Sequence, residues 1–185
     1  NCYYSVSYMM DHIGELIRED DSLQAKYGKL VESGLGAGAA EGGGSDRFTA
    51  FIAVGDYTRD GKIVCAHNTF DNFIDSQYCN VMLSINPSQG NAFIMQTAPG
   101  CIASGTDYYV NSRGMICTET TIGGFSKYRM GDPICCRIRQ AIQYGNTLDD
   151  YVDILKKNNS GDYANSWLLG DTKTNTIMRI ELGLD

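Results

Sequence analysis

Apolar and polar residues alternate in short runs from about residue 48 onward, whereas the first part of the chain follows a helical period. Apolar residues recur at helical spacing over residues 4–19, and a second helical segment follows, with Asp21 or Ser22 as its expected cap. Glycine dominates residues 34–44, so this stretch buries little apolar surface and resembles a linker. We therefore expect a helical segment (residues 1–33), a linker (34–46) and a strand-rich domain (47–185).

The strand-rich domain is predicted to contain an antiparallel sheet with a pair of helices on one face. Turn signals such as Asp60-Gly61 and Pro99-Gly100 separate short apolar runs. Thr147 is placed to cap the second helix, with Asp150 at its third position. Strands, then helices, then strands again indicate an α+β fold. The expected strands are residues 49–55, 62–69, 78–86, 91–97, 107–111, 114–121, 164–170 and 175–182, and the expected helices are residues 133–144 and 148–157.

Length, net charge and the lack of long apolar runs argue against several classes of protein. The 185 residues suffice for one domain with a substantial core. The net charge of -7 argues against nucleic acid, because phosphate contacts need clustered lysine and arginine. No apolar run approaches the roughly 20 residues that span a bilayer, which argues against an integral membrane protein.

Seven cysteines and one glycosylation triplet favour a secreted or lysosome-like compartment, with the cytoplasm as the alternative. The triplet is Asn158-Asn159-Ser160. Cys65 and Cys117 interrupt apolar strands, where cysteine is more often a small buried hydrophobe than half of a disulfide. The absence of a C-x-x-C pair and the presence of only two histidines argue against a zinc site, and no metal or organic cofactor is expected.

The first two expected strands form a hairpin that carries candidate chemistry. The second strand ends on His67-Asn68 and continues to Asp71. In a hairpin this end lies across from residues 48–49, so His67 or Asn68 can reach whatever opens the first strand. The alternative is an ordinary polar strand end at the surface.

Two further segments offer polar side chains at strand ends. Glu119 and Thr120 close an apolar strand, although threonine is also simply a good strand former. Asn165 precedes an apolar strand and could donate its amide hydrogens to an oxyanion, or cap a turn. Trp167, the single tryptophan, is expected in the core.

Together these motifs resemble a known family. Their order is FTAF, DG and AHNTF, then APG and SGTDYYVNSRGMICTETTIGG, then NNSGDYANSWLLGD. This order is similar to that of the phospholipase B-like proteins and the acyl-coenzyme A:6-aminopenicillanic acid acyltransferase-like proteins, both of the N-terminal-nucleophile superfamily. The resemblance covers about residues 47–185. It implies a four-layer αββα sandwich that is cut by autoproteolysis, and hydrolysis or transfer of acyl groups.

The resemblance also implies roles for individual residues. It places Phe48 where family members have the nucleophilic cysteine, a position from which phenylalanine cannot attack. His67 and Asn68 match the pair beside the nucleophile. The remaining matches are Asn165 at the oxyanion hole, Thr120 in the Glu-Thr-Thr motif with Glu119, and Asp107 and Asn111 near the site.

Three hypotheses follow for the activity. The first is a catalytically silent relative with a structural or binding role, in which Phe48 fills the former pocket. The second is an active hydrolase that uses Thr49 after cleavage before it, although neighbouring strand residues point to opposite faces. The third is a parent protein with cysteine at position 48. The expected partners are a small acyl-amide or lipid ligand, and a second chain or neighbouring protomer that completes the fold, because family members continue past Asp185.

Overall fold

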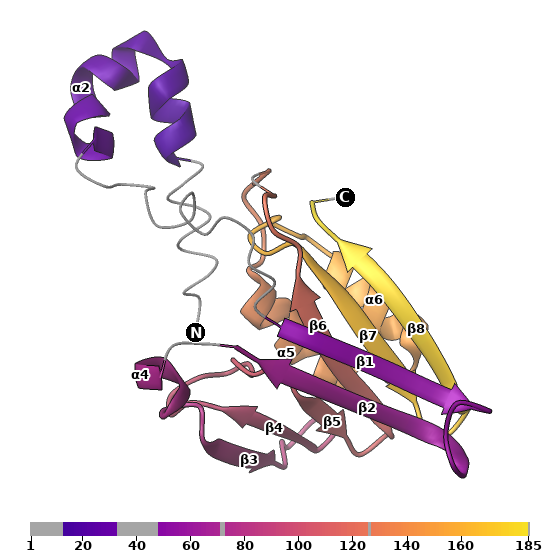
Figure 1. Cartoon of the computed structure of the whole chain (residues 1–185). Coiled ribbons are helices and arrows are strands. Elements are labelled where there is room, and N and C mark those ends of the chain that lie inside the picture. The colour runs from indigo at the N-terminus through magenta and orange to yellow at the C-terminus, as the bar shows by residue number, and fades with distance from the viewer. Residues whose placement is uncertain (1–12, 33–47, 71–72, 126, 185) are drawn as a thin grey trace.

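The protein, seen in a computed structural model, has three layers (Figure 1). The structure describes residues 13–32, 48–70, 73–125 and 127–184. A hairpin of β1 (Phe48–Gly55) and β2 (Gly61–Thr69) lies across one face of a six-stranded sheet. Two helices, α5 (Ile134–Tyr144) and α6 (Leu148–Lys156), cover the other face.

The six-stranded sheet is an antiparallel meander in which every strand pairs with its neighbours in sequence. The helix pair lies between its fourth and fifth strands along the chain. These observations confirm the predicted α+β class with antiparallel sheets and helices on one face. The strands are β3 (Val81–Ile85), β4 (Phe93–Thr97), β5 (Tyr109–Asn111), β6 (Met115–Thr121), β7 (Asn165–Asp171) and β8 (Thr176–Leu182).

The main core lies between this sheet and the helices. Cys117 pairs with Leu169 and both side chains are fully buried on the helix-facing side, which confirms Cys117 as a buried hydrophobe. Trp167 joins the same core, as expected. On the hairpin-facing side, a Cβ atom on Gly170 would lie 3.0 Å from Ile52 of β1, so the missing side chain lets the two layers approach closely.

Capping side chains mark where α6 and α2 begin. The Thr147 hydroxyl accepts from the Asp150 backbone N–H, and the Asp150 carboxylate accepts from the Thr147 N–H, which confirms the predicted cap of α6. The cap of α2 (Asp21–Glu32) differs from the prediction. Asp20, not Asp21 or Ser22, accepts hydrogen bonds from the next turn, because its carboxylate lies 3.0 Å from the Leu23 N–H.

A buried ion pair ties α5 to the segment that enters β7. Arg137 donates to Asp162 at 3.1 Å, and the two side chains are 2% and 0% exposed. Arg137 also donates to the carbonyls of Leu155 and Asp132, and the second Asp162 oxygen accepts from the Ile134 N–H. Every charged atom of the pair therefore has a partner, which is the condition for burying charge without a large penalty.

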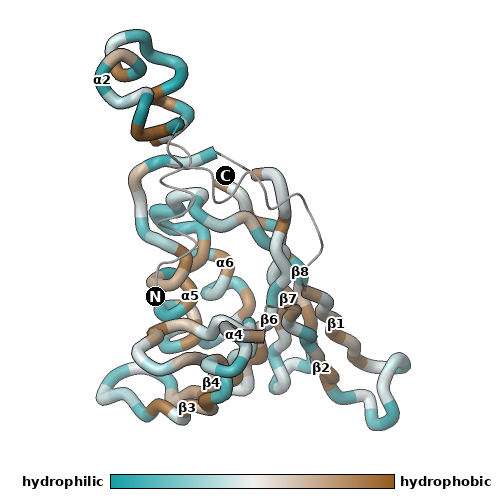
Figure 2. Tube along the Cα trace, turned by 60° about the vertical axis from the view of Figure 1, so that its left-hand side comes forward, coloured by the Kyte–Doolittle hydropathy of each residue, from teal (hydrophilic) through white to brown (hydrophobic). Residues whose placement is uncertain are grey.

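Element boundaries differ from the predictions in a few places. β5 begins at Tyr109 rather than residue 107, because Asp107 adopts a left-handed φ of 56° that a strand does not allow. The short helix α4 (Phe73–Ser76) was not predicted. Residues 13–19 are helical, whereas the rest of the first predicted helix and the predicted linker lie outside the described residues. The turn between β1 and β2 is hydrophilic, as its Asp-Gly signal suggested (Figure 2).

Candidate active site

The hairpin separates its residues onto two faces. Phe48 pairs with Thr69 and Ala50 pairs with His67, and these side chains face the six-stranded sheet. The ring centroids of Phe48 and His67 are 5.7 Å apart. Thr49 pairs with Asn68 on the opposite, exposed face, where the Asn68 amide donates to the Thr49 hydroxyl at 3.1 Å. The start of β1 therefore lies close to His67 and Asn68, as expected. However, Phe48 and His67 lie on the inner face of the hairpin, whereas Thr49 and Asn68 lie on the outer face.

One ring nitrogen of His67 is hydrogen-bonded, and the other faces a carboxylate beyond hydrogen-bond distance. Its Nδ1 lies 3.2 Å from the hydroxyl of Thr69, two residues along the same face of β2. Its Nε2 lies 3.6 Å from an Asp107 carboxylate oxygen, and the His67 side chain is only 5% exposed. Burial lowers the pKa of His67, and a backbone contact with Glu119 partly offsets this effect.

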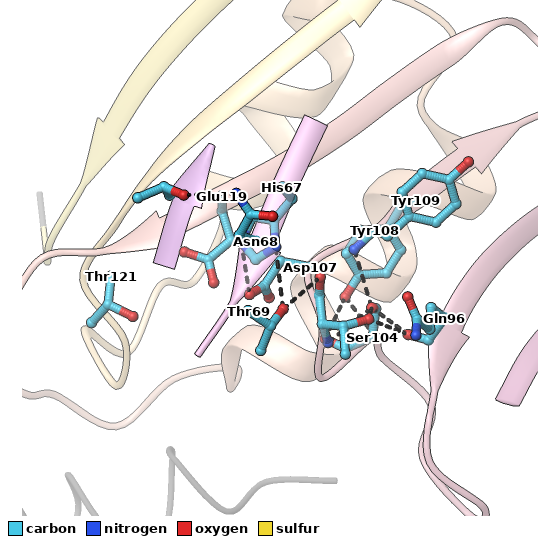
Figure 3. A network of polar contacts seen from close by, with 12 residues as sticks. His67, Asn68, Thr69, Gln96, Ser104, Asp107, Tyr108, Tyr109, Glu119 and Thr121 are labelled. Atoms are coloured by element: carbon cyan, nitrogen blue, oxygen red, sulfur yellow. Dashed lines mark hydrogen bonds and ion pairs between the residues drawn. The ribbon is translucent and has the colours of Figure 1, made fainter. Parts of the chain in front are cut away.

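Asp107 is positioned by a hydrogen-bonded loop between β4 and β5 (Figure 3). The Ser104 hydroxyl donates to the Gln96 carbonyl and accepts from the backbone N–H of Thr106 and of Tyr108, at 3.2 Å and 3.1 Å. These bonds close the loop around Asp107. The backbone of Asp107 is in the left-handed region, which aspartate tolerates better than most residues do. The carboxylate is thereby directed at the His67 ring.

Asp107 and Glu119 form a pair of buried carboxyl groups. Glu119 lies on β6, is 1% exposed, and accepts from the Tyr163 hydroxyl at 2.9 Å. Burial raises the pKa of Glu119 to about 7, although contacts with Asp107, Tyr163 and Asn165 act in the opposite direction. Burial also raises the pKa of Asp107 well above its ordinary value, and the Glu119 charge raises it further. Two adjacent buried carboxyls do not ionise together easily, so the two groups titrate as a coupled pair, at higher pH than free carboxyls.

Several buried polar atoms near this pair have no hydrogen-bond partner. They include the second Glu119 oxygen and both amide atoms of Asn165, a residue that is 0% exposed. The Asn165 amide lies beside Glu119 without reaching hydrogen-bond geometry. The indole N–H of Trp167, which pairs with Glu119 across β6 and β7, is also without an acceptor. Buried polar groups are normally paired, so these atoms indicate a place for water or a ligand group.

A pocket of about 550 Å³ opens beside His67. On one side it is bounded by β2, and on the other by the end of β4, the loop that enters β5, and β6. The Thr118 hydroxyl in its wall is unpartnered, and Thr118 is 1% exposed. The lining residues are Cys65, Ala66, His67, Asn68, Thr69, Phe70, Gln96, Thr106, Tyr108 and Thr118.

Other candidates lie outside this group. Asn111 lies at the far end of β5 from Asp107, where its amide donates to the carbonyls of Ile142 and Gly145, so the structure does not bring it together with His67. Thr120 shares the hairpin-facing side of β6 with Thr118, on the opposite side from Glu119. Asp71 lies outside the described residues.

The comparison with known families decides the assignment. The sequence pattern of the phospholipase B family matches residues 45–180. The chain belongs to the phospholipase B family. The match covers every strand of the hairpin and nearly all of the six-stranded sheet, so the pocket, His67 and Asp107 all fall inside the family region.

Individual relatives are distant and much longer. The mouse (Mus musculus) protein "Putative phospholipase B-like 2" is 30% identical over 129 residues, which are 60% of this chain and 22% of that protein. A Caenorhabditis elegans protein, "Putative phospholipase B-like 3", is 31% identical over 98 residues, or 48% of this chain and 17% of that protein. The chain thus corresponds to less than a quarter of the length of these relatives.

Three further properties concern the described residues alone. No disulfide joins the six cysteines among them. No helix in that part of the chain is both long and apolar enough to cross a membrane. No cluster of three histidine, cysteine or acidic side chains there has an arrangement suited to a metal ion.

The sequence interpretation missed one member of the group around His67. Thr69 follows the His-Asn pair directly, and strand alternation alone places it on the His67 face. The positioning role of Ser104 was also missed, since nothing local in the sequence shows that its hydroxyl would serve three backbone groups.

Proposed function

We propose that this protein is a phospholipase B-like module of the N-terminal-nucleophile type that binds an acyl lipid or acyl amide beside His67 and does not use an N-terminal nucleophile. The observation that carries this proposal is the placement of Phe48 and Thr49. The Phe48 ring, 9% exposed, packs on His67 at the position that the family resemblance assigns to the nucleophile. Thr49, the alternative nucleophile, faces away from His67.

The shape and chemistry of the pocket fit an acyl ligand. Ala66, Phe70 and Tyr108 give it apolar walls, while Thr118 and His67 offer polar groups deeper inside. An exposed apolar track continues from the pocket across β4 and β3. Ile94 is 42% exposed and stands two residues from Gln96 on the same strand face, and Met82, 58% exposed, pairs with Gln96.

Binding can be tested with an ether-linked lysophospholipid, which has no ester to hydrolyse. Titration calorimetry below the micelle concentration should show saturable binding. Tyr108→Ala should weaken it several-fold, because Tyr108 lines the pocket. Tyr57→Ala is the matched control, since Tyr57 is 90% exposed in the hairpin turn and should bind like the unchanged protein. Equal affinity in both variants, or no saturable binding, would contradict the proposal.

Cleavage is tested on the same material by intact mass and N-terminal sequencing. The proposal expects the peptide bonds before Phe48 and before Thr49 to remain intact after long incubation. A new N-terminus at Thr49 would instead support the N-terminal-nucleophile alternative. Cysteine at position 48 of natural material would be revealed by the same mass measurement.

A structural role is supported by the unpaired hairpin. Among the described residues β1 and β2 pair only with each other, and Phe51 and Val64 on their outer face are 54% and 46% exposed. We therefore also propose that further strands, from the same polypeptide or a neighbouring protomer, pair with the hairpin and complete an αββα sandwich. Phe51→Lys should then weaken this association in light scattering of the natural assembly, whereas Tyr57→Lys should not.

A secretory or lysosome-like location remains part of the proposal. Asn158, the acceptor of the glycosylation triplet, is exposed, whereas Asn159 and Ser160 are buried. A loss of mass after N-glycosidase treatment of natural material, absent in Asn158→Gln, would support it. An unchanged mass would favour the cytoplasmic alternative.

A further inference from the structure

Three side chains, those of Thr69, His67 and Asp107, have an arrangement that an N-terminal nucleophile does not require. The Thr69 hydroxyl lies 3.2 Å from His67 Nδ1. The opposite ring nitrogen, Nε2, lies 3.6 Å from the Asp107 carboxylate. A hydroxyl, an imidazole and a carboxylate in this order match the general pattern of an activated nucleophile, in which a base is oriented by a third group.

The same residues face a site that could hold a substrate. Thr69 and His67 both line the 550 Å³ pocket. Thr118, also in its wall, is 1% exposed and has an unpartnered hydroxyl. A buried hydroxyl without a partner needs an acceptor, and the carbonyl oxygen of a bound ester would provide one.

We propose that Thr69, His67 and Asp107 act as nucleophile, base and positioning carboxylate in the hydrolysis of a carboxylic ester held in this pocket. This inference rests on the proposed binding of an acyl ligand there. The nucleophile is then Thr69, two residues after His67 on β2, and not a residue at the start of β1.

The reaction is balanced without any further reactant than water. Thr69 Oγ1 forms a bond to the ester carbonyl carbon while its proton passes to His67 Nδ1. The ester C–O bond then breaks, and the alcohol leaves with that proton. Water adds to the acyl-threonine as His67 takes a proton and returns it to Thr69 Oγ1, which releases the carboxylic acid. When the imidazolium forms, the Asp107 carboxylate, 3.6 Å from Nε2, draws close enough to accept its N–H and stabilises the positive charge.

The geometry favours Thr69 over the other hydroxyl of the hairpin. Thr49 is exposed and accepts a hydrogen bond from Asn68 on the outer face, with the strand between it and His67. Thr69 has its hydroxyl within reach of the ring and only a long contact, 3.5 Å, to the carbonyl of Thr106. The separations of 3.2 Å and 3.6 Å are of the loose kind common in sites without a bound substrate.

The first test is covalent trapping of the unchanged protein with an alkyl fluorophosphonate. The threonine oxygen displaces fluoride from phosphorus, and His67 takes the proton. Trypsin then separates the two hairpin threonines, because Thr49 lies on peptide 48–59 and Thr69 on peptide 63–113. Fragmentation should locate the added mass on Thr69. Absence of an adduct on Thr69, or an adduct only on Thr49, would overturn the proposal and does not depend on any variant folding.

The second test measures hydrolysis of a p-nitrophenyl acyl ester. His67→Asn should lower the rate by about 100- to 10,000-fold, the usual range for losing a general base. Thr69→Val should lower it at least as much, whereas Thr69→Ser, which keeps the hydroxyl, should retain activity. Thr176→Val is the control, an exposed threonine on β8, and should hydrolyse the ester at the unchanged rate. Equal rates in Thr69→Val and Thr176→Val would overturn the proposal.

Asp107 is tested by the pH dependence of the same rate. The titratable groups that face His67 or the carboxyl pair are Asp107, Glu119, Cys65, Cys79, Tyr109, Cys117 and Tyr163. The rate should rise with pH as the pair loses its proton, and Asp107→Asn, which suits the left-handed backbone, should lower the rate and flatten this rise. An unchanged profile would overturn the role of Asp107. Binding of the ether lipid without any Thr69 adduct would reject the chemistry alone and leave the proposed binding function intact.

Discussion

Replacing Glu119 by glutamine should make the stability of the protein less sensitive to pH. Glu119 is 1% exposed, and burial raises its pKa from an ordinary 4.5 to about 7. The folded state therefore holds this proton more tightly than the unfolded chain does. The contribution of Glu119 to stability therefore falls as pH rises from about 4.5 through about 7, because unfolding allows this group to release its proton.

The size of the effect follows from the same shift. A tenfold change in proton affinity is worth about 1.4 kcal/mol, so the rise of the Glu119 pKa corresponds to about 3 kcal/mol. Glutamine carries no titrating proton, and its carbonyl can still accept from the Tyr163 hydroxyl. Relative to the unchanged protein, Glu119→Gln should therefore gain about 3 kcal/mol between pH 4 and pH 8.

Urea unfolding at a series of pH values measures this difference. Fluorescence of Trp167, the single tryptophan and 2% exposed, reports the transition. Glu181→Gln is the control, because Glu181 is an exposed carboxylate on β8 and its replacement should leave the pH dependence unchanged. Parallel stability curves for Glu119→Gln and the unchanged protein would refute the assignment of a buried, proton-retaining carboxyl.

Three further changes test the fold in the same unfolding assay. Asp162→Ala should cost about 3–5 kcal/mol, because it leaves the buried Arg137 guanidinium without its counterion, and a change no larger than that of an exposed pair would contradict this. Gly170→Val should cost about 1–3 kcal/mol by forcing the hairpin away from the sheet, since even a Cβ would lie 3.0 Å from Ile52; a neutral result would mean that the layers yield freely. Thr147→Ala should cost about 1 kcal/mol through loss of the α6 cap, whereas Thr147→Ser should cost little.

The sequence predicted the elements of the fold well because their signals are local. Alternating apolar residues between turn signals located each strand to within a few residues, and the Thr147–Asp150 pattern located the start of α6. The hairpin register followed from the same signals, so the closeness of β1 to the His-Asn pair could be predicted. Strand alternation also predicted that Thr49 would turn away from His67.

The rest of the site depends on contacts that the sequence does not display. Asp107 reaches His67 because β5 starts late and the loop before it folds around Ser104. Its pairing with Glu119 arises in the loop that enters β5, so the sequence around either residue does not predict the other. The same holds for Arg137 and Asp162, which are separated by 25 residues and are brought together by the tertiary fold.

Because residues 48 and 49 lie on opposite faces of the hairpin, only a substitution at position 48 can place a nucleophile at the start of β1 beside His67. Phenylalanine and cysteine codons differ at one base, so a single nucleotide change could replace the ring on His67 by a thiol without moving any strand. A side chain at residue 49 points to the outer face, and the one-residue slip of β1 that would bring it inward would turn the whole inner row of β1 outward. Gain or loss of a thiol beside His67 therefore needs one codon change and leaves the residues that line the pocket in place.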